Sequence, residues 1–69
     1  MNFDDIGSVI KKRRSSLRID QRTLSELSGI AVHTLSNIEA GKGNPTVATL
    51  DRVLQALGME LRIQIKGQQ

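Results

Sequence analysis

Residues 19–58 read IDQRTLSELSGIAVHTLSNIEAGKGNPTVATLDRVLQALG, and most of the signals for the fold lie within them. Asp20 is a favourable N-cap, because its carboxylate can accept a hydrogen bond from a free N–H of the first turn. It predicts a short helix over residues 21–28. Gly29 can adopt the left-handed conformation that ends a helix, so a turn is expected directly after it.

A second short helix follows this turn, beginning near Val32 and stopping at Gly41. Each helix has two apolar residues three positions apart, which are expected to face inward: Leu24 and Leu27 on the first, Leu35 and Ile38 on the second. Two short helices joined by a glycine-containing turn of this length form a helix-turn-helix.

Two longer helices are expected to flank this motif. The first covers residues 5–17, with an inner face formed by Ile6, Val9, Ile10 and Leu17. The last begins after the N-cap Thr46 and is closed by Gly58. Its core face consists of Val47, Leu50, Val53, Leu54 and Leu57. Residues 41–45 (GKGNP) form the connecting loop.

Arg14 interrupts the inner face of the first predicted helix. It lies four residues after Ile10 and three before Leu17, so its side chain shares their side of the helix. An unpaired guanidinium in an apolar environment is costly. Arg14 therefore needs an acidic partner from elsewhere in the chain.

The C-terminal segment changes from helical to alternating periodicity. Over residues 59–66 (MELRIQIK), apolar and polar residues alternate, as in a strand with one buried face. The apolar set is Met59, Leu61, Ile63 and Ile65. Since no other segment alternates, we expect this strand to pair antiparallel with its copy in a second chain. A frayed tail or a further helical turn is the alternative, and residues 67–69 are expected to be disordered.

The chain has 69 residues, which is enough for one domain with a thin stability margin. It contains no cysteine, and its single histidine, His33, has no second histidine with which to complete a zinc site. Neither a metal nor another cofactor is expected. Dimerisation is the remaining means of stabilising so small a domain.

The net charge is +3, and the basic residues are concentrated near the N-terminus. The cluster consists of Lys11, Lys12, Arg13, Arg14, Arg18 and Arg22. It can attract a phosphate backbone or form an ordinary solvated helix face; an anionic membrane fits less well, because few large apolar residues accompany it. No apolar run approaches the ~18 residues of a membrane span, and no signal peptide is recognisable. A cytoplasmic location is expected.

The sequence from Ile19 to Gly58 resembles the Cro/C1-type (XRE) helix-turn-helix family. The residues that carry the resemblance are Gln21, Leu24, Gly29, Thr34, Ile38, Glu39, Gly41, Lys42, Asn44, Pro45, Leu57 and Gly58. It implies an all-α, four-helix, lambda-repressor-like DNA-binding domain over residues 1–58. It also implies that Glu39 is the partner of Arg14.

Two positions depart from the family pattern. Ala31 replaces the usual Ser or Thr cap of the third helix, a loss of about 1 kcal/mol. The repressor type often continues into a fifth helix, whereas here the strand-like residues 59–66 follow directly. This ending resembles the Hip-type antitoxins, in which a short C-terminal strand from each subunit forms a dimer-spanning sheet.

The outward face of the helix that begins near Val32 is the expected base-reading surface. Opposite its two inward residues lie Val32, His33, Ser36 and Asn37. Asn37 can pair with adenine, His33 can donate to guanine, and Val32 can pack on a thymine methyl group. Without the surrounding motif, these would be ordinary solvent-facing residues.

A second set of residues is expected to contact DNA phosphates. Gln21 opens the predicted helix over residues 21–28, and the N-terminus of that helix suits an anion. Its amide can also brace the helix that begins near Val32. The resemblance adds Thr34, Lys42 and Asn44 to this set. In the alternative interpretation, the loop glycines serve only to turn the chain and Lys42 is simply solvated.

Two functions from different classes fit the sequence. The first is a dimeric transcriptional repressor that binds a palindromic operator, either alone or, as the antitoxin of a toxin–antitoxin pair, with a kinase-like toxin as partner. The second is a protein-interaction module of the same fold that binds no operator. An enzyme is not expected, because His33 has no recognisable nucleophilic triad and residues 41–43 lack the pattern of a phosphate-binding loop.

Overall fold

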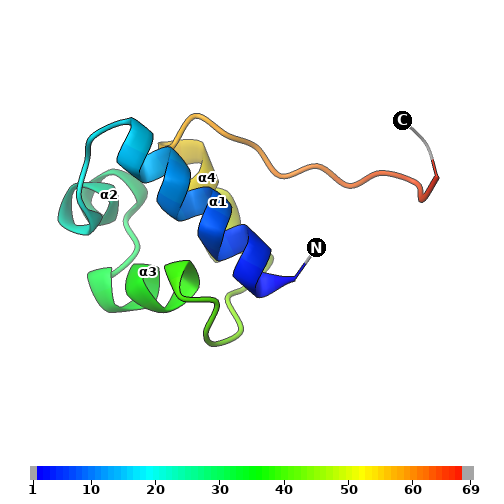
Figure 1. The fold of residues 1–69 in the computed structure, drawn as a ribbon, viewed down its shortest axis with the longest axis horizontal. Helices are drawn as coiled ribbons and strands as arrows, with labels where there is room; N and C mark the ends of the chain where they lie inside the picture. The colour runs from blue at the N-terminus through cyan, green and yellow to red at the C-terminus, as the bar shows by residue number, and fades with distance from the viewer. Residues whose placement is uncertain (1, 68–69) are drawn as a thin grey trace.

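The computed structural model describes residues 2–67, apart from the side chain of Asp4. The regular structure of this part consists of helices α1 (Phe3–Ser16), α2 (Gln21–Ser28), α3 (Val32–Glu39) and α4 (Val47–Ala56). The all-α, four-helix prediction is confirmed. Figure 1 shows them followed by a tail that runs away from the helices. None of the helices within residues 2–67 has the length and apolar character to cross a membrane.

Helix α1 begins earlier than predicted, because its cap is Asn2. The Asn2 side chain accepts a hydrogen bond from the Asp5 amide at 2.9 Å, and the Asp5 carboxylate accepts one from the Asn2 amide at 3.3 Å. This reciprocal arrangement is a capping box. The sequence prediction started the helix at residue 5 because it overlooked Asn2 as a cap.

The remaining helix starts follow their predicted caps. Asp20 accepts a hydrogen bond from the Thr23 amide at 2.8 Å, and Thr46 accepts one from the Thr49 amide at 3.1 Å. Gly29 ends α2 with a φ of 74°, in the left-handed region that favours glycine. Ala31 provides no side-chain cap for α3, so that helix begins without this support.

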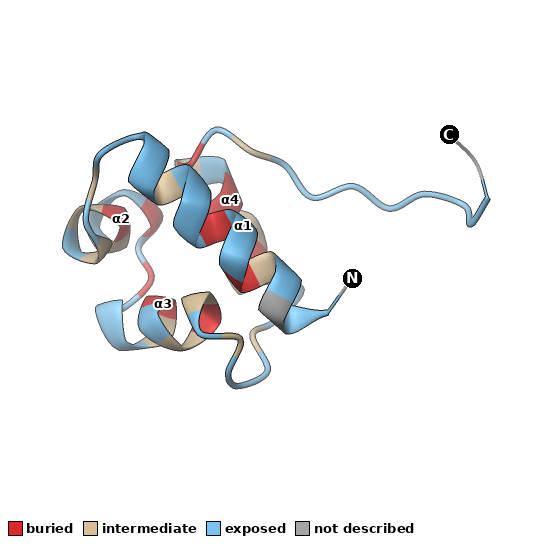
Figure 2. Ribbon diagram, viewed as in Figure 1, coloured by how far each residue is buried: buried red, intermediate tan, exposed pale blue. Residues whose placement is uncertain are grey.

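A single apolar core lies between the four helices, shown as red segments in Figure 2. Its buried residues are Ile10, Leu24, Ile30, Leu35, Ile38, Leu50, Val53, Leu54 and Leu57. Helix α3 packs against both α1 and α2, and α2 also packs against α4. These contacts bury most of the predicted inward residues and hold the helix-turn-helix in place.

Four residues predicted to face inward are exposed instead. Leu27 is 61% exposed, because the buried line of α2 runs through Leu24 and Ser28 and leaves Leu27 to one side. Val47 is 65% exposed, because it opens α4 one turn before the core face begins. Leu17, the cap residue after α1, and Val9 are both partly exposed.

Gly7 determines how closely α1 and α3 approach each other. It is buried, and a Cβ added there would overlap the carbonyl oxygen of Ile38 and lie 2.9 Å from that of Glu39. The main chain at the end of α3 therefore occupies the space of a side chain on α1. The sequence prediction assigned no role to this glycine.

The tail begins at Gly58, whose φ of 73° turns the chain out of α4. Residues 59–65 have no regular secondary structure in the single chain, and neither the predicted strand nor the alternative helical turn forms there. A strand at this position needs a second chain with which to pair, so it remains a prediction. Of the expected disordered residues 67–69, the last two lie outside the described residues.

Candidate nucleic-acid interface

Helix α3 is held on its inner side and open on its outer side. Leu35 is fully buried and Ile38 is nearly so. On the opposite side, Val32, His33 and Ser36 are exposed and Asn37 is half-buried. The structure therefore brings the four predicted base-reading residues together on one accessible face.

Asn37 and His33 lie close to each other on this face, one helical turn apart. The Asn37 Nδ2 atom is 3.5 Å from the His33 Nε2 atom. At this distance the interaction is weak, and a ligand can replace it at little cost. Two side chains with hydrogen-bond donors and acceptors are thus presented side by side to solvent.

A shallow depression of about 190 Å³ lies between α3 and the loop that follows it. It is lined by Thr34, Asn37, Ile38, Lys42, Gly43, Asn44 and Pro45. The loop is held against the helix by the Lys42 amide, which donates to the Asn37 carbonyl at 2.8 Å. Three of the four predicted phosphate-contacting residues therefore line one depression, together with the predicted base-reading residue Asn37.

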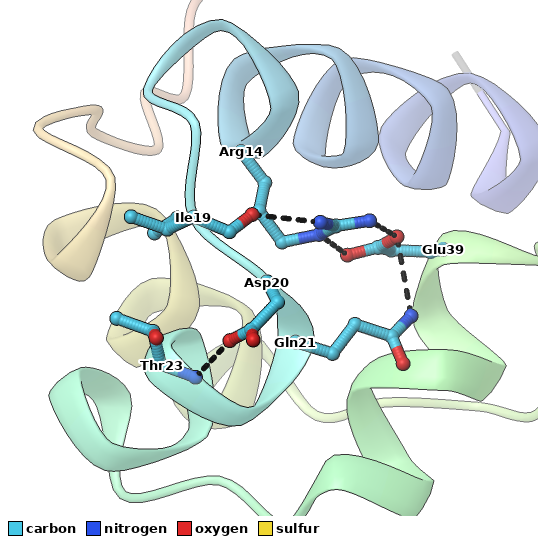
Figure 3. A network of polar contacts seen from close by, with 6 residues as sticks. All are labelled: Arg14, Ile19, Asp20, Gln21, Thr23 and Glu39. Carbon is cyan, nitrogen blue, oxygen red and sulfur yellow. Dashed lines mark hydrogen bonds and ion pairs between the residues drawn. The ribbon is translucent and has the colours of Figure 1, made fainter.

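A polar network fixes α3 to the two helices before it (Figure 3). The Arg14 guanidinium donates from Nε to Oε2 of Glu39 at 2.7 Å and from Nη2 to Oε1 at 2.9 Å. Its Nη1 donates to the Ile19 carbonyl at 2.9 Å. The side chains of Arg14 and Glu39 are only 14% and 4% exposed. The structure thus brings Arg14 together with the partner that the family resemblance implied.

The protonation of this pair is set by its surroundings. The hydrogen bond to Glu39 raises the pKa of Arg14 above its ordinary value. Burial acts to raise the pKa of Glu39, but the hydrogen bonds from Arg14 and Gln21 and the charge of Arg14 outweigh it, so the pKa is lowered. Both groups are therefore charged at neutral pH.

Gln21 belongs to this network as well as to the predicted phosphate contacts. Its Nε2 donates to Oε1 of Glu39 at 3.3 Å, and Figure 3 shows its amide oxygen turned away from that carboxylate. The bracing role that the sequence allowed for Gln21 is therefore present. One N–H of its amide is used in this contact, and a phosphate would have to take the other.

The basic cluster divides into structural and exposed members. Arg14 is paired with Glu39, and Arg13 donates from Nε to the Leu57 carbonyl at the end of α4, at 2.9 Å. Sequence reasoning did not find this role of Arg13, because it depends on where α4 ends relative to α1. The members with exposed residues and no such role are Lys11, Lys12, Arg18 and Arg22.

A family model described as helix-turn-helix matches residues 10–64, most of the described chain. The chain belongs to the Cro/C1-type helix-turn-helix family. The α2–turn–α3 unit is the motif from which this helix-turn-helix domain takes its name.

Three relatives are transcriptional regulators of the helix-turn-helix type. The regulator PuuR of Escherichia coli is 36% identical over 63 residues, which cover 86% of this chain and 34% of PuuR. Two regulators of Sinorhizobium fredii, y4dJ and y4mF, are 37% and 28% identical; the matches cover 78% and 93% of this chain, and 70% and 84% of those proteins. The match to this chain thus spans about a third of the length of PuuR but most of the length of the other two relatives.

Proposed function

We propose that this chain is a dimeric transcriptional repressor that binds a specific site on double-stranded DNA. The observation that carries the proposal is the open face of α3 beside a depression lined by Lys42 and Asn44. In helix-turn-helix proteins, the second helix of the motif enters the major groove with its N-terminal residues on the base edges. The relatives named as helix-turn-helix transcriptional regulators support a role in transcription regulation.

The proposed base contacts follow from the chemistry of the exposed side chains. Asn37 can make a bidentate pair with adenine, and His33 can donate to N7 or O6 of guanine. Val32 begins α3 and can pack on a thymine methyl group. Ser36 lies between them on the same exposed face and can contact either kind of base edge.

The proposed phosphate contacts flank this reading surface. Thr34, Lys42 and Asn44 line the depression at one side of α3, and Gln21 lies at the N-terminus of α2 on the other. Such contacts set the position and orientation of a domain on the duplex without reading its sequence. The Arg14–Glu39 network supports them by fixing α3 relative to α2.

The proposed dimer is held together by residues 59–66. Ile63 and Ile65 are 94% and 72% exposed in the single chain, and an exposed apolar alternation of this kind is stabilised by pairing with a second strand. Two copies related by a two-fold axis would present two α3 helices to one operator. The preferred site is then a near-palindrome with half-sites about 34 Å apart.

Selection from a random duplex library tests the DNA-binding proposal. The expected result is enrichment of a near-palindrome, bound with an affinity that falls steeply as salt rises, because bound phosphates release counterions. A chain that enriches no sequence and shows no salt-dependent DNA binding is not a repressor. The alternative, a protein-interaction module that keeps the fold without an operator, would then replace it.

We also propose that the repressor is the antitoxin of a toxin–antitoxin pair, with a kinase-like toxin as its partner. The likeness of residues 59–66 to the C-terminal strand of Hip-type antitoxins supports this role. The test is to express the tagged chain from its own chromosomal locus and purify it. Stoichiometric recovery of the protein encoded by the adjacent gene is expected, and purification of the chain alone would refute the antitoxin role while leaving the repressor intact.

A further inference from the structure

An apolar groove of about 130 Å³ lies beside the start of the tail, on the side of the molecule formed by α1 and α4. It is lined by Ile6, Val9, Leu50, Leu54, Met59 and Leu61, with Glu60 at its edge. Val9 and Leu61 are partly exposed there. The tail thus forms one wall of a groove that its own apolar residues do not fill.

The rest of the tail carries the apolar side chains that such a groove could accept. Ile63 and Ile65 share with Leu61 the alternating positions of one strand face. In Figure 2 the tail beyond the groove is pale blue, the colour of exposed residues, as it leaves the helices.

From the proposed dimer, on which this inference rests, we infer that the two tails pair antiparallel about Ile63 and that Ile65 of each copy fills the groove of the other. A symmetric pairing must place apolar residues opposite apolar residues, because a slip by one position turns one strand's apolar face over. The two-fold axis therefore passes through a residue. The candidates are residues 61–64, which lie in the middle of the alternating segment 59–66.

Charge excludes two of these four registers. An axis through Arg62 sets Arg62 opposite its own copy. An axis through Gln64 sets Arg62 opposite Lys66 of the second copy. Like charges directly opposite one another destabilise a strand pair. An axis through Leu61 or Ile63 instead sets Glu60 opposite a cation, Arg62 in the first case and Lys66 in the second.

The end of α4 decides between the two that remain. Gly58 has a φ of 73° and Leu57 is the cap of α4, so strand geometry can begin only at residue 59. An axis through Leu61 would then limit the paired segment to residues 59–63 and leave Ile65 unpaired. An axis through Ile63 pairs residues 60–66, up to Gly67 with its φ of 87°, and includes Leu61, Ile63 and Ile65.

The register about Ile63 also accounts for the groove. It sets Ile65 of the second copy opposite Leu61, on the same face of the ribbon. Since Leu61 lines the groove, the neighbouring isoleucine is delivered to its mouth, close to Val9. Charge and strand length alone select this register, and it brings Ile65 of the second copy to an apolar groove that can accept its side chain.

Disulfide trapping tests the register, because the chain contains no cysteine of its own. Residues directly opposite in an antiparallel pair have Cα atoms about 4.5–5.5 Å apart, within the range of a disulfide. The Ile63→Cys chain should therefore form a covalent homodimer on mild oxidation. In Leu61→Cys or Ile65→Cys, the equivalent positions are about 14 Å apart and should cross-link poorly. A refolded mixture of these two variants should cross-link to each other.

The groove is tested in the same way with a matched control. Val9→Cys mixed with Ile65→Cys should form a mixed disulfide. Val47→Cys mixed with Ile65→Cys should not, because Val47 is more exposed than Val9 but does not line the groove. Equal cross-linking of the two mixtures would show that Ile65 does not enter the groove.

Charge exchange gives a second readout that needs no cysteine. Glu60→Lys should weaken the dimer about 2- to 30-fold, as two cross-strand pairs become repulsive, and adding Lys66→Glu should restore it. Arg62→Glu is the control: it faces Gln64 in the proposed register, and its ion pair with Glu60 of the same chain is exposed and contributes little, so it should have little effect. An axis through Leu61 would instead set it against Glu60 of the second copy. A large loss with Arg62→Glu would refute the proposed register.

The outcomes separate this inference from the proposed function. Self-cross-linking by Leu61→Cys but not by Ile63→Cys would move the axis and overturn the register while the tail dimer stands. A parent that sediments as a dimer, with no cross-linking by any tail cysteine, would show that the tails are not the interface. A parent that sediments as a monomer would refute the proposed dimer itself.

Discussion

Glu39 is the residue through which three helices are joined. Its side chain is almost fully buried, it accepts two hydrogen bonds from Arg14 of α1, and it accepts a third from Gln21 of α2. The negative charge offsets the guanidinium inside the fold. Removing one member of such a pair leaves the other charge buried without compensation, which costs more than the pair itself contributes.

Replacing Glu39 with alanine should therefore lower the free energy of unfolding by about 3–5 kcal/mol. Thermal or urea unfolding followed by circular dichroism measures this change. Glu26→Ala, a surface position on α2, is the control and should stay near the parent. A Glu39→Ala chain that melts within about two degrees of the parent would show that Arg14 is solvated in solution.

The same carboxylate gives stability a dependence on pH. The pKa of Glu39 in the fold lies below its ordinary value of 4.5. A lowered folded-state pKa contributes stability that is fully present above the unfolded value and is lost as the pH falls through the folded value. The stability difference between the parent and Glu39→Gln should thus be constant near neutrality and narrow below about pH 4.5. A difference that stays the same throughout the acid range would contradict it.

Replacing Asn37 and Lys42 with alanine, one at a time, should change DNA binding in different ways. Loss of the Asn37 amide should remove about 1–3 kcal/mol of discrimination at one base pair in each half-site. Loss of the Lys42 charge should weaken all sequences alike and reduce the salt slope by about one phosphate. Binding of both variants to the selected site and to single-base changes of it, across a salt series, measures both effects. The same uniform loss from both variants would show that α3 does not read bases.

Residue-level prediction succeeded where the constraint lies within one helix. Arg14 could be recognised as needing a partner because its place in the helical period put it among apolar residues. Gly7 and Arg13 were missed for the opposite reason. Their roles depend on carbonyl groups at the ends of α3 and α4, whose positions follow only from the packing of whole helices.

At the scale of single helices, the contact between α1 and α3 sets a limit that helix propensity would not suggest. Alanine is normally favoured over glycine within a helix by about 1 kcal/mol. Gly7→Ala should nevertheless destabilise the domain by about 1–3 kcal/mol, because the added methyl group meets the main chain of Ile38 and Glu39.

Ser8→Ala is the matched control for this change. Ser8 is the next residue of α1 and is exposed, so its replacement should stabilise slightly, by a few tenths of a kcal/mol. Urea unfolding measures both changes: the free energy of unfolding should fall for Gly7→Ala and rise slightly for Ser8→Ala. If Gly7→Ala were stabilised as much as Ser8→Ala, the close approach of α1 to α3 would be absent in solution.

The ends of the helices were predictable wherever a local hydrogen bond sets them. Asp20 and Thr46 cap α2 and α4, and the left-handed Gly29 ends α2, each through interactions between near neighbours in sequence. The face that a short helix buries was less predictable. In α2, only two turns long, a small rotation places Leu27 outside the core and Ser28 inside it.

At the scale of the whole molecule, proline at Ile63 should disrupt the proposed dimer. Proline removes a ladder N–H and is poorly tolerated within a paired strand. Sedimentation should show the Ile63→Pro chain as a monomer at concentrations where the parent is a dimer. Its circular dichroism should remain helical, because residue 63 lies beyond α4. A dimer of unchanged affinity would place the interface elsewhere.

The tail shows what a single chain leaves undetermined. Its alternation is plain in the sequence, but residues 59–65 have no regular structure when the chain stands alone. A strand depends on backbone partners, whereas a helix supplies its own. The four helices therefore follow from this chain, and the proposed strand requires a second.

The hydrogen bond from Arg13 to the Leu57 carbonyl has a further consequence for the proposed dimer. It ties the end of α4 to α1 just before the tail departs, so the tail leaves each domain in a fixed direction. The two domains would then be held at a set rotation about the duplex axis as well as a set distance. Once one half-site is occupied, the second domain faces a high effective concentration of the other half-site. Inserting half a helical turn between the half-sites would put them on opposite sides of the duplex and remove that advantage, although every contacted base would be unchanged.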